Sequence, residues 1–477
     1  MITKQPIRIA SIDVFRAMTM FLMIFVNDFF TLTGDVPDWI GHATRMQDML
    51  GFSDIILPSF LFIVGMSIPH AIENRFAKGD THLQILGHIM LRVLALIIMG
   101  IFQVNASAGG IMIDVFREGG IWIGAEGARR EITPQIFRIV MVIGFFLVWN
   151  VYPRAKDWKK YLFLGLQLLG IALLIYLAFI YRNRDGLALL FRCVEGACLN
   201  TGAEGRWILQ TRWYGILGLI GWAYGICALI YLFISRAKLT PQIIAWVIIV
   251  IFSMFGASGR LMYDAIDLGF MAGTHLGFMQ NIIPDNGTLQ AFTMSGVILS
   301  TLFTRWLSAG KPVNKLFLPV LGLGVAMLIL GFASMQIWHI SKLVATPTWM
   351  FFCVGIAIIS YMGFFWLIDV KGKKNWFKAI SPAGTATLTC FLLPTIAYAL
   401  IQIARTPFPE IVLVYPITQL LNALPFVCDS VVESFAQYRF PFIRTIWAVE
   451  LLKCALFSLF IIGIVYLLGK IGIRLKV

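Results

Sequence analysis

Long apolar stretches recur along the whole sequence, and they restrict the fold more than any other feature. Of the 477 residues, 59% are hydrophobic and only 13% are charged. Many stretches reach the roughly 20 residues that a helix needs to cross a hydrocarbon layer about 30 Å thick. Inside lipid, each segment must satisfy its backbone hydrogen bonds internally, so the spanning structures are helices or closed barrels.

The pattern within these stretches favours helices. The runs Leu91–Phe102 and Ala455–Leu468 lack the alternation that is typical of a barrel strand. We therefore predict an all-α fold, a polytopic transmembrane helical bundle with about 10–12 spans. The candidate spans are residues 9–30, 53–75, 82–104, 132–152, 160–181, 212–235, 240–258, 287–307, 315–339, 347–369, 381–404 and 446–469. Three prolines interrupt Phe408–Val427, which favours a re-entrant or interfacial segment.

Lysine and arginine residues define the expected orientation, because cytoplasmic loops are enriched in them. They gather in alternate loops around Lys4 and Arg8, Arg75 and Lys78, Arg154 to Lys160, Arg236 and Lys238, Arg305 to Lys315, Lys371 to Lys378, and Lys470 to Lys476. We expect both termini in the cytoplasm and one domain over residues 1–477, with the longer opposite loops forming an extracytoplasmic cap. The formal charge of +14 then reflects topology, and we expect the lipid bilayer as a partner and no nucleic acid.

Two features bear on the compartment. The basic N-terminus is followed by a charged apolar stretch without a small-residue cleavage site, which indicates a retained first helix. We expect a compact protein of a bacterial cytoplasmic (inner) membrane. Cys193 and Cys198 share one hydrophilic loop and can form a disulfide if that loop lies outside.

The first span carries three polar residues at informative spacings, Asp13, Arg16 and Asn27. Arg16 and Asn27 are eleven residues apart, so a helix places them on one stripe, roughly 16 Å apart along its axis. Asp13 precedes Arg16 by three residues and can pair with it. Charged groups in membrane helices usually face the bundle interior and mark function. The alternative is a structural ion pair at one end and a polar helix terminus at the other.

A short polar loop holds His42 between the first two spans, on the expected outer side. Asp54 opens the second span near that side. It can cap the helix, or it can orient an imidazole or a substrate amine. Asp28 adds a second carboxylate after Asn27. We predict substrate contacts for Asp28 and Asp54, and a catalytic role for His42.

Further polar residues lie in the next two spans. Asn105 ends the third span on the outer side, level with Asn27, and we predict that it also contacts substrate. Arg92 and Arg138 add buried positive charge to the third and fourth spans. The other histidines, His70, His82, His88, His275 and His339, are weaker candidates. No HxxxH or CxxC pattern indicates a metal site, and we expect none.

The first 140 residues resemble a known family of membrane enzymes. The segment RIASIDVFRAMTMFLMIFVND, the loop histidine and SDIILPSFLFIVGMSI are similar to the catalytic region of heparan-α-glucosaminide N-acetyltransferases and their bacterial relatives. Matching positions in order are Ser11, Asp13, Phe15, Arg16, Val26, Asn27, Asp54, Pro58, Phe60, Phe62, Ile63 and Gly65. Ala17 stands where the family usually has glycine, and Arg138 is what remains of a longer arginine-containing motif.

This resemblance implies transfer of acetyl from cytosolic acetyl-CoA to the amine of a terminal glucosamine across the membrane. Acetyl-CoA is then the co-substrate and an amino sugar the acceptor, and the family suggests a homodimer. A neutral imidazole suits proton removal from the amine near neutral pH, which makes His42 the predicted general base. Asn27 is predicted to hydrogen-bond the oxyanion or the amine. An acetyl-His42 intermediate is the alternative route.

Positive charge near the cytoplasmic side would hold the CoA phosphates. We predict that the CoA-binding residues are Arg8, Asp13, Arg16, Arg92 and Arg138. Two other functions stay open at this point. One is O-acetylation of a cell-envelope glycan, which differs in the acceptor. The other is a secondary transporter or flippase, although the sequence lacks the paired halves with broken helices that many transporters have.

Overall fold

The computed structural model describes most of the apolar segments of the chain. The described residues are 10–32, 36–44, 47–107, 112–113, 122–123, 130–131, 133–153, 158–182, 215–256, 287–312, 314–405 and 447–475. Arg8, the cysteine pair Cys193 and Cys198, and the segment Phe408–Val427 lie outside these ranges.

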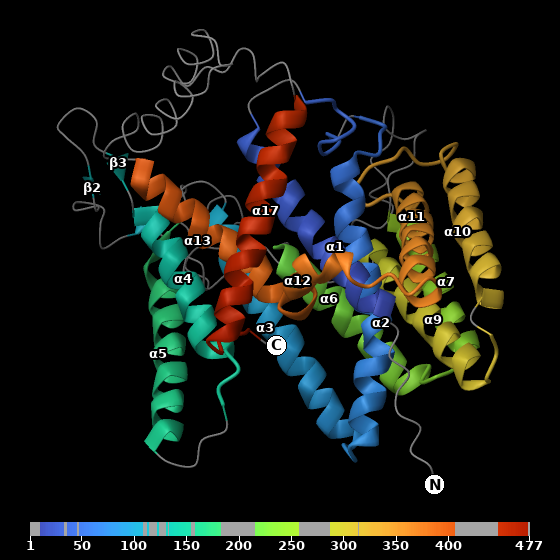
Figure 1. The fold of residues 1–477 in the computed structure, drawn as a ribbon, viewed down its shortest axis with the longest axis horizontal. Coiled ribbons are helices and arrows are strands. Elements are labelled where there is room, and N and C mark those ends of the chain that lie inside the picture. The colour runs from blue at the N-terminus through green and yellow to red at the C-terminus, as the bar shows by residue number, and fades with distance from the viewer. Residues whose placement is uncertain are drawn as a thin grey trace, which may run out of the picture. The chain divides into compact units, whose positions relative to one another are not determined.

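Helices form almost all of this structure, which confirms the predicted all-α class (Figure 1). The α-helices are α1 Ala10–Asn27, α2 Ile56–Ala77, α3 His82–Ser107, α4 Thr133–Trp149, α5 Trp158–Ile180, α6 Ile216–Leu229, α7 Leu239–Gly256, α9 Thr288–Ser308, α10 Asn314–Ser334, α11 Pro347–Phe365, α12 Ser381–Thr385, α13 Thr387–Arg405 and α17 Trp447–Lys470. Short 3-10 helices are η1 Asp28–Thr31, η2 Phe52–Ile55 and η9 Trp376–Ala379, and π-helical turns are η5 Ile230–Ile234 and η8 Trp366–Val370.

In the ranges that the structure describes, strands occur as two short antiparallel pairs. β1 (Met112–Ile113) pairs with β4 (Tyr181–Arg182), and β2 (Trp122–Ile123) pairs with β3 (Arg130–Glu131). Each strand has two residues. These pairs are therefore too short to span a membrane as a barrel.

Within the described residues, eight helices are long and apolar enough to span a membrane. They are Ala10–Thr31, Phe52–Ala77, His82–Ala106, Trp158–Ile180, Ile216–Ile234, Asn314–Ser334, Pro347–Val370 and Leu451–Lys470. Three apolar helices are shorter, Thr133–Trp149, Leu239–Phe255 and Thr387–Ile403. The remaining predicted span, residues 287–307, is the helix α9, whose many hydroxyl side chains make it less apolar.

The chain groups into two compact units, which we describe separately. Unit 1 comprises Met1–Asn27, Val36–Ile98 and Ile216–Thr387, and unit 2 comprises Asp28–Asp35, Met99–Gly215 and Leu388–Val477. Both units are discontinuous in sequence, so each contains helices that lie far apart along the chain.

Two parallel-running helices, α2 and α9, meet at backbone distance in the centre of unit 1. A Cβ atom on Gly65 would lie 1.8 Å from the backbone oxygen of Thr293, and one on Gly296 would lie 1.9 Å from that of Phe62. Small residues permit such close approach between membrane helices, where packing rather than water exclusion drives association. The buried hydroxyls of Thr293 and Ser295 donate to carbonyls of their own helix. Because these hydroxyl groups have hydrogen-bond partners, α9 can be buried although it carries polar side chains.

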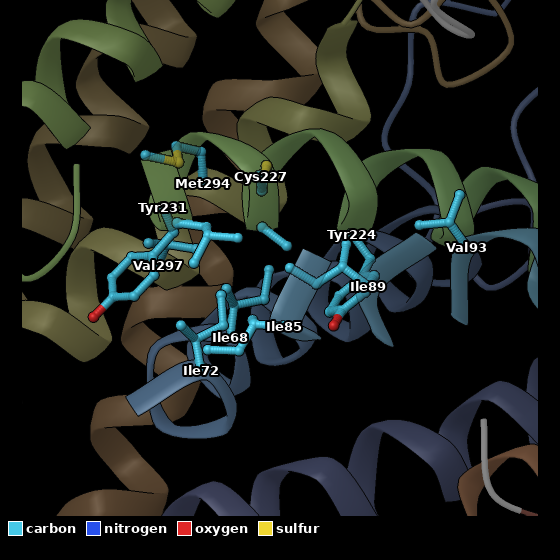
Figure 2. Close-up of a cluster of buried hydrophobic side chains, with 12 residues drawn as sticks. Ile68, Ile72, Ile85, Ile89, Val93, Tyr224, Cys227, Tyr231, Met294 and Val297 are labelled. Atoms are coloured by element: carbon cyan, nitrogen blue, oxygen red, sulfur yellow. The ribbon is translucent and has the colours of Figure 1, made fainter. Parts of the chain in front are cut away.

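A cluster of aliphatic and aromatic side chains fills the space beside this contact (Figure 2). Its buried members are Ile68, Ile72, Ile85, Ile89, Val93, Tyr224, Cys227, Ala228, Tyr231, Leu232, Met294 and Val297. They come from α2, α3, α6, η5 and α9, so five elements of unit 1 share one core.

The helix α11 contacts the starts of both α1 and α2, one at each of its ends. At its first turn, the indole nitrogen of Trp349 donates to the backbone oxygen of Asp54, at 3.2 Å. At the opposite end, the Asp369 carboxylate accepts the backbone N–H groups of Ala10 and Ser11, at 3.1 and 3.0 Å. An acidic group at a helix N-terminus is stabilising because it satisfies unpaired donors. The start of α1 thus lies at the end of α11, and the start of α2 lies at its beginning.

In unit 2, α4 and α5 pack through small residues. A Cβ on Gly170 would lie 2.7 Å from the Cβ of Leu147. The chain after α17 returns to the end of α4, where Arg474 donates its backbone N–H to the Asn150 side chain, at 2.9 Å. This contact fixes the last described residues to the fourth predicted span.

Candidate active site

The loop that carries His42 is folded onto the start of α2 by backbone hydrogen bonds. Phe52 donates its N–H to the oxygen of Trp39 at 2.7 Å, and Ser53 donates to that of Ile40 at 3.3 Å. The loop closes tightly because Gly41 and Gly51 touch, and a Cβ on Gly51 would lie 2.1 Å from the Gly41 oxygen. The loop and the first turn of the second span therefore form one structure.

This closure brings His42 against Asp54. The ring nitrogen Nδ1 of His42 lies 2.7 Å from Oδ1 of Asp54. The carboxylate is almost fully buried, with its side chain 1% exposed, whereas the imidazole is 48% exposed. The other oxygen, Oδ2, accepts the backbone N–H groups of Ala43 and Gly51, at 3.0 and 3.3 Å. Asp54 is therefore held from several sides and acts on the imidazole as a fixed acceptor.

A lysine from a distant part of the chain completes this site. Lys342, in the loop between α10 and α11, places its Nζ 3.6 Å from Oδ1 of Asp54 and 3.2 Å from Nδ1 of His42. Its side chain is 24% exposed. The loop is fixed by Asp48, whose carboxylate accepts the N–H of Ile340 at 2.7 Å.

The geometry favours one tautomer of the imidazole. When Nδ1 carries the proton, it donates to the buried carboxylate, and the lone pair of Nε2 is available for proton transfer. A buried aspartate that orients a histidine in this way is the arrangement found in hydrolase triads, where Nε2 acts as the base. The site can therefore accept a proton from a substrate group at Nε2.

The predicted pair in α1 is present as well. Nη1 of Arg16 lies 3.4 Å from Oδ1 of Asp13, and Nη2 donates to the Ser67 hydroxyl of α2 at 2.6 Å. Both charged side chains are partly exposed, 26% for Arg16 and 36% for Asp13. Arg16 lies about three turns of helix before Asn27, which ends α1 and is exposed.

Asp28, the first residue of unit 2, is buried. It accepts a hydrogen bond from the Tyr398 hydroxyl at 2.5 Å and one from the Thr31 hydroxyl at 3.3 Å. A carboxylate with these partners anchors α13 to η1, so the contacts favour a structural role beside the predicted substrate contact.

The remaining predicted residues are spread over both units. In unit 1, Arg92 lies over the ring of Tyr224, 4.6 Å from its centre, which is a cation–π contact between α3 and α6. In unit 2, Asn105 donates to the backbone oxygen of Ile101 at 2.7 Å, and Arg138 donates to that of Ala106 at 3.0 Å. The structure therefore contains the predicted pair of Asp13 with Arg16, and it pairs His42 with Asp54, one of the alternatives that the sequence left open for Asp54.

Across the described part of the chain, no group of three or more His, Cys, Asp or Glu side chains has a metal-binding arrangement. His82, one of the weaker candidates, packs its ring against Phe76, with centroids 4.8 Å apart.

These helices and this site define an integral membrane protein with a histidine–carboxylate pair at the start of its second span. Residues 8–125 match the family model for heparan-alpha-glucosaminide N-acetyltransferase, catalytic. The resemblance seen in the sequence is thereby confirmed over that segment, which contains Arg16, His42 and Asp54.

Two relatives show the extent of the similarity. The heparan-alpha-glucosaminide N-acetyltransferase of Homo sapiens is 34% identical over 122 residues, which are 25% of this chain and 18% of the human protein. The protein of the same name from Mus musculus is 29% identical over 148 residues, which are 31% of this chain and 20% of the mouse protein. The match thus spans about a fifth of the length of these curated relatives.

Sequence reasoning did not identify Lys342, which is separated from His42 by 300 positions and lies outside the matching segment. One signal pointed to it. Lys342 is a basic residue in a short loop at the end of the bundle where the topology predicts the outside, and such loops are usually poor in lysine.

Proposed function

We propose that this protein is a transmembrane N-acetyltransferase that moves acetyl from cytosolic acetyl-CoA to the amine of a glucosamine or related amino sugar. The observation that supports it most is the contact between His42 and the buried Asp54, within a segment related to named N-acetyltransferases. Acyl transfer to an amine needs a base that is neutral at working pH, and an oriented imidazole supplies one.

The proposed step forms one bond and breaks one. The unprotonated amine nitrogen attacks the thioester carbonyl carbon of acetyl-CoA, and the carbon–sulfur bond breaks to release the CoA thiolate. Nε2 of His42 takes the proton that the amine loses, and Asp54 stabilises the imidazolium through Nδ1. The proton then passes to the thiolate or to water, which restores the neutral imidazole.

Asn27 is proposed to stabilise the oxyanion that forms on the thioester carbonyl, as amide donors do in other acyl-transfer sites. Asn105 and Asp28 are kept as proposed acceptor contacts. A two-step route, with acetyl carried on Nε2 of His42, uses the same residues and differs in whether CoA leaves before the acceptor binds.

For the donor, we propose that Arg16 binds a phosphate group of CoA, with Asp13 and Ser67 fixing its side chain. Arg8, Arg92 and Arg138 are proposed as further phosphate contacts. The rise of roughly 16 Å from Arg16 to Asn27 fits the pantetheine arm, which would carry the thioester towards the end of the bundle where His42 lies.

The proposed setting is a bacterial cytoplasmic membrane, with both termini inside and the His42 site outside. Two contacts support placing the start of α1 and the start of α2 on opposite sides of the membrane. Asp369 meets the start of α1 at one end of α11, and Trp349 meets Asp54 at the other end. We further propose a homodimer, as the family resemblance suggests.

The direct test is transfer of radiolabelled acetyl from acetyl-CoA to glucosamine by the purified protein. Labelled N-acetylglucosamine that resists mild alkali would support the proposal. An alkali-labile product would indicate O-acetylation instead. Absence of both transfer and acetyl-CoA binding would contradict the proposal and favour a transporter.

Replacing Arg16 by alanine should weaken acetyl-CoA binding about 10-fold or more, since a hydrogen bond to a charged group contributes roughly 1.5–3 kcal/mol. Calorimetric titration of the purified protein measures it. Arg75→Ala is the matched control, because that arginine, in the last turn of α2, already pairs with Asp80. Equal affinity of Arg16→Ala and wild type would remove Arg16 from the CoA site.

A further inference from the structure

Lys342 makes a contact that a simple aspartate–histidine pair does not need. Its ammonium nitrogen approaches Nδ1 of His42 to 3.2 Å and Oδ1 of Asp54 to 3.6 Å. Nδ1 can donate to the carboxylate or accept from the ammonium, but it cannot do both at once. Because the carboxylate oxygen is nearer, at 2.7 Å, Nδ1 donates to Asp54, and the lysine pairs with Asp54 beside it.

A second positive charge at this position acts against protonation of the imidazole. The buried carboxylate alone would stabilise an imidazolium strongly, because an opposite charge in contact favours the charged form. An imidazolium cannot accept a proton from an amine. The ammonium group of Lys342 offsets the carboxylate, because it would lie within 3.2 Å of a second cation whenever the ring is protonated.

We propose that Lys342 is a positioning residue that keeps His42 neutral and aligned with Asp54. This role deepens the proposed function and rests on it, since it concerns His42 as the base. Among the described residues, Asp54 and Lys342 are the ionisable side chains that contact His42. In the two surrounding loops, Asp48 is bound to Ile340, Asp38 is exposed and His339 is buried.

The site thereby depends on a part of the chain beyond the family match. Lys342 is carried by the loop between α10 and α11, and Trp349 in the first turn of α11 binds the backbone of Asp54. The same segment therefore holds Asp54 through its backbone and places a charge beside its side chain.

The experiment measures how readily His42 takes up a proton, independently of catalysis. Diethylpyrocarbonate modifies neutral imidazoles, so the rate of His42 modification is followed against pH by peptide mass spectrometry in detergent-solubilised full-length protein. We expect Lys342→Gln to raise the pH of half-maximal modification by about one unit, the effect of a unit charge at this distance even with full water screening. Lys342→Arg should keep the wild-type midpoint, as should Lys311→Gln at an exposed lysine elsewhere.

An unchanged midpoint in Lys342→Gln would overturn the proposal, and so would an equal shift in Lys342→Arg, because charge would then not be the cause. The acid limb of the acetyl-transfer profile in Lys342→Gln should move in the same direction. Failure of the wild-type protein to transfer acetyl would contradict the proposed function while the modification midpoint still tests Lys342. Lys342→Met, which keeps the length of the side chain, provides a second neutral variant if Lys342→Gln does not fold.

Discussion

A His42→Ala protein should bind acetyl-CoA as the wild type does and transfer acetyl about 10²–10⁴-fold more slowly. General-base catalysis by a positioned side chain contributes a factor of this size. The predicted CoA contacts in α1, Asp13 and Arg16, lie about three to four helical turns before Asn27 at the end of the helix, so removal of an imidazole from the loop that follows should leave them in place. Radiolabelled transfer at saturating acetyl-CoA, beside a binding titration, measures both quantities.

His82→Ala is the matched control, because His82, the first residue of α3, packs its ring on Phe76 of α2 and has no part in the proposed chemistry. Its transfer rate should stay near that of the wild type. Full activity in His42→Ala would exclude His42 as the base. Parallel loss of binding and transfer would instead indicate that the loop helps to hold acetyl-CoA.

The second large effect is expected at Gly65, where an alanine should lower the free energy of unfolding by about 3 kcal/mol or more. Overpacking in a tight interior typically costs about 1–3 kcal/mol, and backbone displacement costs more. The added Cβ would lie 1.8 Å from the Thr293 carbonyl oxygen, so α2 and α9 must separate. Chemical or thermal unfolding of the purified protein in detergent measures the loss.

Gly363→Ala provides the comparison within a helix of the same unit. Nothing lies within 4 Å of a Cβ built on Gly363, and alanine is the better helix former by about 1 kcal/mol. This variant should be at least as stable as the wild type. Similar stability of the two variants would mean that α2 and α9 do not meet at backbone distance.

The sequence was sufficient to predict the helices, because each span is a local signal. Every predicted span contains a helix, although 132–152 ends earlier in the structure, at Trp149, 315–339 ends earlier, at Ser334, and 381–404 divides into α12 and α13. The division follows from Ala386, whose backbone leaves the helical region between the two. The grouping of these helices into two discontinuous units follows from long-range packing, which no local pattern encodes.

The candidate site was predictable in part where the partners are near in sequence. Asp13 and Arg16 are three residues apart, so helical spacing predicted that pair. The contact between His42 and Asp54, twelve residues apart, was one of the alternatives that the sequence left open for Asp54. Lys342 was missed because its contact depends on how the loop before α11 folds back to η2. Asn105 and Arg138 were predicted from their positions in the third and fourth spans, and in the structure both donate to backbone oxygens within unit 2.

The backbone contact between α2 and α9 has a consequence for the order of events during synthesis. Gly65 emerges from the ribosome more than 200 residues before Gly296, which corresponds to roughly 10–50 s at 5–20 residues per second. During that interval α1 and α2 are in the membrane with Asp13, Arg16 and Asp54 and without α9 or α11. Nascent chains at this stage should depend on the insertion machinery to shield these polar groups, and they should be the form most exposed to membrane proteases.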